Sequence, residues 1–104
     1  MAGSGELLWP REAAASAVDW VAARGLGIIG GEVYVGLGKA KGVFNAEWQT
    51  APQWLPAEPW ESFVDRAAAQ AAAAILGEAV TTGPSTWYFL AVALEDGYPP
   101  YLRG

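Results

Sequence analysis

The segment "TWYFLAVAL", residues Thr86–Leu94, constrains the fold most strongly, because apolar side chains fill both of its faces. Its β-branched and aromatic residues favour a strand over a helix. A strand that is apolar on both sides is either central in a covered sheet or part of an interface. The rest of the chain must therefore supply either covering elements or a surface that a partner buries.

Two segments show the three- and four-residue apolar spacing of amphipathic helices. The first covers about Pro10–Arg24, and Gly25 after it suits a left-handed helix cap. The second covers about Pro59–Leu76 and is expected to stop at Gly77. Both helices have one apolar stripe, so each can cover one side of a sheet.

Two further strands are expected between the helices. Residues Ile28–Val35 alternate and are rich in β-branched side chains, and Val43–Gln49 can return beside them after a polar turn over Gly36–Gly42. The resulting α-β-β-α-β order predicts a small two-layer α+β domain. Its sheet is expected to be mostly antiparallel, with both helices packed on one face.

The length of 104 residues indicates a single domain. We expect residues 1–8 to form a flexible N-terminus and residues 95–104 to form an extended C-terminal tail. The N-terminal sequence does not read as a signal peptide, and no apolar run is long enough to span a bilayer. A cytoplasmic location is therefore the default expectation.

The stretch "GLGIIG", Gly25–Gly30, matches the glycine pattern of dinucleotide-binding loops. In such loops a strand leads into the glycines and a helix leaves them, so that helix N–H groups face the pyrophosphate. Here the order is reversed, with a helix ending at Gly25 and a strand beginning near Ile28. We interpret the stretch as a helix cap, a short turn and a glycine kink, and we expect no cofactor.

Composition excludes several kinds of chemistry. The chain has no Cys and no His, which removes thiolate sites, the commonest metal ligand and the commonest general base. Glu32 and Glu47 could face each other across the hairpin as an acid–base pair, but so small a domain offers little room for a substrate cleft. We therefore expect neither catalytic nor metal-binding residues.

The charge balance indicates what kind of partner the chain could bind. Six basic and eleven acidic residues give a formal net charge of −5. An acidic surface repels phosphate backbones, so nucleic acid is not an expected partner. The same surface suits a basic protein, although mild acidity also simply favours solubility.

The chain has more aromatic residues than a two-layer core can bury. Trp60 and Phe63 fit a helix-to-sheet core, but the sheet face away from the helices would carry other aromatic residues together with a carboxylate. The candidate partner-binding residues are Glu32, Tyr34, Trp48, Trp87 and Phe89. Such surfaces are typical of protein interfaces.

These residues also have structural interpretations that involve no partner. The Pro-rich loop or the C-terminal tail could fold over the aromatic face and bury it. Glu32 follows two glycines, Gly30 and Gly31, which would leave space above the sheet. It could equally point to solvent, or it could pair with Arg66, Lys39 or Lys41.

Three segments stand out together: "LGIIGGEVY" after an amphipathic helix, "EWQ", and "PWESFVDRAAAQA" at the start of the second helix. With the apolar last strand they resemble bacterial immunity proteins of polymorphic toxin systems. They are similar to the immunity protein 40 family over roughly Leu8 to Leu94. The residues that match the shared segments are Gly30, Gly31, Glu32, Tyr34, Trp48 and Trp60.

The resemblance implies a cytoplasmic antidote that binds a cognate toxin and blocks it by protein–protein contact. This chain has "EPWES" where the family has a Gly-Glu-Ser-Trp order, so no role is carried over to Glu58 or Glu61. The residues leave two other functions open. One is a homodimeric structural or regulatory module without catalytic activity, and the other is a small-molecule-binding domain.

Overall fold

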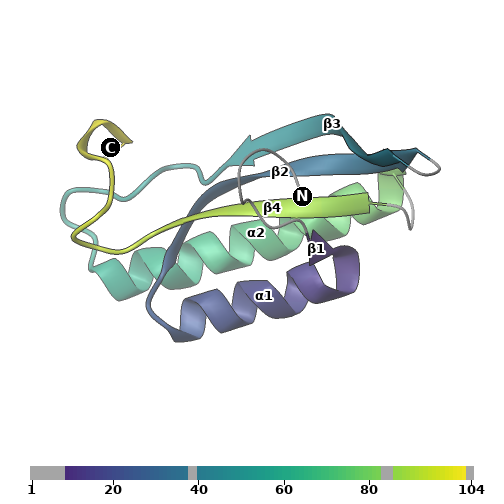
Figure 1. Cartoon of the computed structure of the whole chain (residues 1–104). Coiled ribbons are helices and arrows are strands. Elements are labelled where there is room, and N and C mark those ends of the chain that lie inside the picture. Colours follow the sequence, from purple (N-terminus) through teal and green to yellow (C-terminus); the bar gives the residue numbers. More distant parts are fainter. Residues whose placement is uncertain (1–8, 38–39, 83–85, 103–104) are drawn as a thin grey trace.

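The computed structural model describes residues 9–37, 40–82 and 86–102, and the predicted flexible segment 1–8 lies outside these ranges. Within the described residues, one antiparallel four-stranded sheet has the strand order β1-β4-β2-β3, and two helices lie on one face of it (Figure 1). The predicted α+β class and two-layer arrangement are therefore confirmed. The elements are β1 (Trp9–Pro10), α1 (Arg11–Ala23), β2 (Gly27–Leu37), β3 (Ala40–Gln49), α2 (Trp60–Thr82), β4 (Thr86–Ala93) and the short 3-10 helix η1 (Pro100–Leu102).

The sheet contains one short strand that the sequence patterns do not reveal. In β1, Trp9 pairs with Tyr88 and Pro10 pairs with Trp87, so β4 lies between β1 and β2. A two-residue strand is too short to show alternation, and Pro is disfavoured within strands. Proline is tolerated here because β1 is an edge strand of the sheet.

Helix α1 ends as predicted. Arg24 is its C-cap, and Gly25 follows with a left-handed φ of +73°. The Gly25 N–H donates a hydrogen bond to the Ala22 carbonyl at 3.0 Å. This cap lets the chain reverse directly into β2.

The predicted end of the second helix is wrong, because α2 continues through Gly77 to Thr82. Gly77 does not adopt a positive φ, and a Cβ at this position would meet nothing within 4 Å. A glycine inside a helix costs about 0.5–1 kcal/mol but does not break it. The alanine-rich sequence on either side supplies the helix propensity that offsets this cost.

The predicted turn over Gly36–Gly42 is too long. β2 continues to Leu37 and β3 begins at Ala40, and these two residues are register partners. The pairing register of β2 with β3 shifts between Val33 and Tyr34. This local irregularity lets the two strands stay paired along the longer hairpin.

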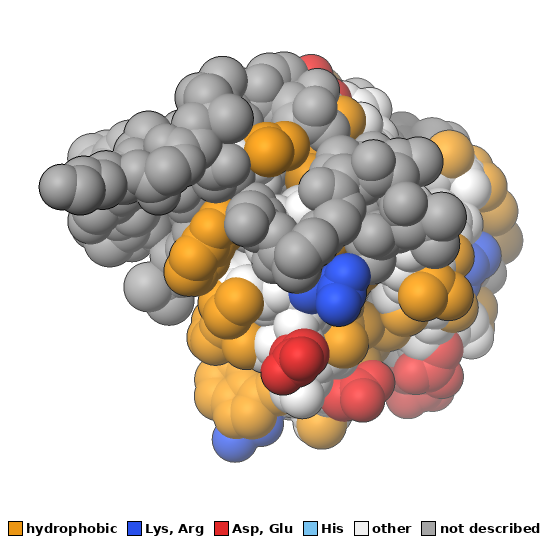
Figure 2. Space-filling model, turned by 90° about the vertical axis from the view of Figure 1, so that its right-hand side faces the viewer, with side chains coloured by type: hydrophobic (Ala, Val, Ile, Leu, Met, Phe, Trp, Pro, Cys, Tyr) orange, Lys and Arg blue, Asp and Glu red, His pale blue; other side chains and the backbone are white. Residues whose placement is uncertain are grey.

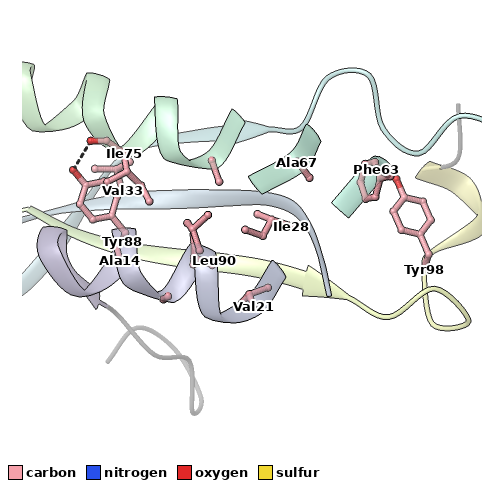
Figure 3. Close-up of a cluster of buried hydrophobic side chains, with 13 residues drawn as sticks. Ala14, Val21, Ile28, Val33, Phe63, Ala67, Ile75, Tyr88, Leu90 and Tyr98 are labelled. Atoms are coloured by element: carbon pink, nitrogen blue, oxygen red, sulfur yellow. Dashed lines mark hydrogen bonds between the residues drawn. The ribbon is translucent and has the colours of Figure 1, made fainter. Parts of the chain in front are cut away.

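The core lies between the helices and the sheet (Figure 3). From the sheet it takes Ile28, Val33, Tyr88 and Leu90, and from the helices mainly small side chains with Phe63 and Ile75. The buried Tyr88 hydroxyl donates a hydrogen bond to the Ile75 carbonyl at 3.2 Å. Small alanines let α2 approach the sheet closely, while the large aromatic side chains fill the remaining volume.

The predicted extended tail is also wrong for the residues that the structure describes. After β4 the chain turns and forms η1, and Tyr98 between them is 7% exposed. The Tyr98 ring makes edge contacts with Trp54, Trp60 and Phe63 at centroid distances of 5.4–5.9 Å. Apolar burial of the Tyr98 ring therefore holds this segment against the domain.

Arg66 fixes the Pro-rich loop between β3 and α2. Its guanidinium forms two hydrogen bonds with the Glu58 carboxylate, at 2.8 and 2.9 Å, and also donates to the carbonyls of Pro52 and Gln53. The hydrogen bond to Glu58 raises the pKa of Arg66 above its ordinary value, although partial burial acts in the opposite direction. Arg66 is thus partly buried against this loop.

Candidate functional site

The sheet has an inner face against the helices and an outer face turned away from them (Figure 1). Val33 and its register partner Tyr88 are buried in the core, so residues of the opposite parity lie on the outer face. Those residues include Glu32 and Tyr34 on β2, and Trp87 and Phe89 on β4. We call these four side chains the outer-face cluster.

Register pairing brings the outer-face cluster together. Glu32 lies opposite Phe89, and Tyr34 lies opposite Trp87, on the two neighbouring central strands. Cross-strand partners in antiparallel sheets have adjacent side chains, so the four residues form one continuous surface. Trp87 is 36% exposed and the other three are partly buried.

The Glu32 carboxylate is held in place from within the cluster. The Tyr34 hydroxyl donates a hydrogen bond to Glu32 Oε1 at 2.7 Å. The two residues are two positions apart on the same strand, and their side chains therefore lie on the same face. This hydrogen bond orients the carboxylate before any partner arrives.

Glu47 on β3 adds a second carboxylate, because it is the register partner of Glu32. Among the described residues neither glutamate takes part in an ion pair. Arg66, considered above as a partner for Glu32, pairs with Glu58 instead, at 2.8 Å. Lys39 and the Lys41 side chain lie outside what the structure describes.

Trp48 lies beside the two glycines of the "GGEVY" segment. A Cβ atom at Gly31 would clash with the Trp48 ring, and one at Gly30 would lie 2.6 Å from the Trp48 carbonyl oxygen. The glycines are therefore needed for the close approach of β3 and its indole ring. Trp48 is the register partner of Gly31 and its ring packs against the core on the inner face, so it does not fill the expected space beside Glu32.

The indole N–H of Trp48 is buried and has no hydrogen-bond partner within the described part of the chain. Buried polar groups usually find a partner, so this donor is an exception that calls for a physical reason.

A small hollow lies on the outer face of the sheet. Its volume is about 170 Å³, and its sides include Glu32, Glu47 and Phe89, with Gln53 and Leu102 nearby. We call it the glutamate hollow. Sites for drug-sized ligands are typically about 300–1,000 Å³, so this one suits a single side chain rather than a small-molecule substrate.

Gln53 connects the glutamate hollow to the aromatic packing at the end of the domain. Its amide nitrogen donates to the Ile29 carbonyl at 2.9 Å, and its amide oxygen accepts from the Tyr98 hydroxyl at 2.7 Å. Gln53 cannot be identified from the sequence, because nothing in a Pro-rich loop indicates which side chain turns back to the sheet.

A second, broader depression of about 490 Å³ lies where the C-terminal end of α1 meets the N-terminal end of α2. Glu61, Asp65 and Glu95 lie around it, together with Trp60 and Gly25. Exposed apolar side chains also stand next to acidic ones on the end of the molecule shown in Figure 2. The surface therefore offers carboxylates in more than one place.

Trp60 and Phe63, which were expected to be structural, lie away from the outer-face cluster. Phe63 is fully buried, and its ring would touch a Cβ atom at Gly27. The indole N–H of Trp60 donates to the Gly25 carbonyl at 2.8 Å, which joins the start of α2 to the cap of α1. Of the five candidate partner-binding residues, Trp48 differs from the rest, because it also packs against the core.

Within the described residues, no group of three or more acidic side chains is arranged to hold a metal ion. Likewise, none of the helices described is both long enough and apolar enough to cross a membrane. Comparisons of the chain with models of protein families, with curated proteins and with solved structures find no match.

Proposed function

We propose that this chain is a cytoplasmic immunity protein that neutralises a bacterial toxin by binding it, without catalysing a reaction. The observation that carries the binding proposal is the outer-face cluster, in which Glu32, Tyr34, Trp87 and Phe89 share one surface. Aromatic residues supply most of the affinity at the centres of protein interfaces, and a fixed carboxylate adds specificity. The cluster has both features.

The identity of the partner as a toxin rests on the sequence resemblance. The segment "GGEVY" carries that resemblance, and it contributes Glu32 and Tyr34 to the cluster. The net charge of −5 favours a basic partner through long-range attraction. An antidote of this kind needs only to cover a functional surface of the toxin, so it requires no cofactor and no deep pocket.

Co-purification with the product of the neighbouring gene tests this proposal. The full chain is expected to form a stable complex with that product and to restore growth to cells that express it. A product that is toxic but neither bound nor counteracted by this chain would refute the assignment. A complex that forms without growth rescue would leave a binding protein that is not an immunity protein.

A further inference from the structure

The glutamate hollow has dimensions that restrict its occupant. Its volume of about 170 Å³ is below that of a typical small-molecule site and suits one long side chain. The hollow lies next to the outer-face cluster and shares Glu32 and Phe89 with it, so a protein that covers the cluster also covers the hollow.

The two carboxylates of the hollow favour a cation as its occupant. Glu32 and Glu47 face each other across β2 and β3, and like charges in directly opposite positions repel. No cationic group among the described residues pairs with either carboxylate. The Tyr34 hydroxyl occupies Oε1 of Glu32, and Oε2 has no partner in the part of the chain that is described. A positive group placed between the two glutamates would remove the repulsion and add charge-assisted hydrogen bonds.

The Phe89 ring favours a planar cation over a compact one. Phe89 is the register partner of Glu32 and lines the same space as the carboxylates. A guanidinium group can donate to two carboxylates in its plane while its face lies on an aromatic ring, whereas an ammonium group is a strongly hydrated point charge.

We infer that the glutamate hollow receives an arginine side chain of the partner protein, bound between the Glu32 and Glu47 carboxylates. This inference rests on the proposed binding function and specifies the chemistry of the contact. It assigns a role in recognition to Glu47 and to the hollow beside Gly30 and Gln53.

The recognition chemistry can be tested without the natural partner. The probe is N-acetyl-arginine methylamide, titrated into the full-length protein while the backbone amides of Glu32 and Glu47 are followed by NMR. We expect saturable shifts of both signals. The citrulline analogue, which has the same shape without the charge, is expected to give none, and the lysine analogue is expected to bind more weakly.

Charge-neutralising variants locate the site. Glu47→Gln and Glu32→Gln are each expected to weaken binding of the arginine probe by roughly three- to tenfold. Glu95→Gln removes the same charge from an exposed turn and is expected to leave binding unchanged. Equal binding of the citrulline analogue, or equal weakening by Glu95→Gln, would overturn the inference, as would the absence of saturable shifts.

The same variants separate this inference from the proposed function. If the wild-type chain binds the neighbouring gene product and Glu47→Gln binds it equally well, the arginine inference is wrong and the binding function stands. If the wild-type chain binds the arginine probe at the hollow but not that gene product, the toxin assignment is wrong and the recognition chemistry stands.

Discussion

Glu32 and Glu47 are register partners on adjacent strands, so two carboxylates of like charge lie directly opposite each other on the outer face of the sheet. An arrangement of this kind lowers the stability of the free protein by a few tenths of a kcal/mol up to about 1 kcal/mol. The cost is recovered when a cation binds between the two groups. The pair therefore connects the stability of the free domain to the chemistry of its partner.

Replacing one of the two carboxylates is expected to stabilise the free protein. Glu47→Lys turns a repulsive cross-strand pair into an attractive one, which should raise the free energy of unfolding by roughly 0.5–1 kcal/mol. For a domain of this size that corresponds to an increase in Tm of about 2–8 °C. Thermal unfolding followed by circular dichroism measures it. The same variant should bind the partner less well, and a variant that is both less stable and equally competent in binding would contradict this account.

Substitution by alanine at two glycine positions is expected to change the stability of the protein in opposite directions. Gly31→Ala places a Cβ atom against the Trp48 ring and the Phe89 carbonyl, so it should destabilise the protein by roughly 1–3 kcal/mol. Gly77→Ala meets open space inside a helix and should stabilise it by about 0.5–1 kcal/mol. Denaturant unfolding compares the two, and similar effects of both substitutions would show that the packing of Trp48 on Gly31 is wrong.

Arg66 is expected to control the loop that carries Gln53. Arg66→Lys cannot keep the forked contact with Glu58 while also reaching the carbonyls of Pro52 and Gln53, so it should cost about 1–2 kcal/mol. Hydrogen exchange at the Trp54 indole N–H, which donates to the Glu58 carbonyl, should become faster. Arg24→Lys, at the exposed C-cap of α1, is the matched control. Equal exchange rates in the two variants would argue against the role of Arg66.

The free protein is expected to be a monomer at micromolar concentration. In a two-fold dimer that used the outer face, the glutamates of both copies would meet in one interface, and like charges there oppose association. Sedimentation velocity at low and physiological salt tests this expectation. A stable dimer that dissociates in Trp87→Ala would instead support the alternative of a homodimeric module.

The sequence predicts most of the fold because its apolar periodicity is strong. The apolar run Thr86–Leu94 correctly indicates a central strand, the stripes of the two helices correctly indicate the layers, and Gly25 correctly indicates a cap. The end of α2 cannot be predicted from Gly77, because a glycine ends a helix only when the residues after it disfavour helical structure. β1 was missed because a strand of two residues has no period to detect.

The candidate site was predictable only in part, for a physical reason. Alternation along β2 and β4 is enough to place Glu32, Tyr34, Trp87 and Phe89 on one face. The positions of Gln53, Arg66 and Tyr98 depend instead on how irregular segments fold back on the domain. Their hydrogen bonds join residues that are far apart in the sequence, and no local pattern encodes such partners.

The most direct test of the account compares two tryptophans that both lie at the surface. Trp87 belongs to the outer-face cluster, whereas Trp20 lies on α1, is 55% exposed and stacks with Arg24. The dissociation constant for the product of the neighbouring gene should be measured by calorimetry for Trp87→Ala and Trp20→Ala. The account predicts a weakening of at least about tenfold for Trp87→Ala and little change for Trp20→Ala. Wild-type affinity in Trp87→Ala, or an equal loss in Trp20→Ala, would contradict binding through the outer face.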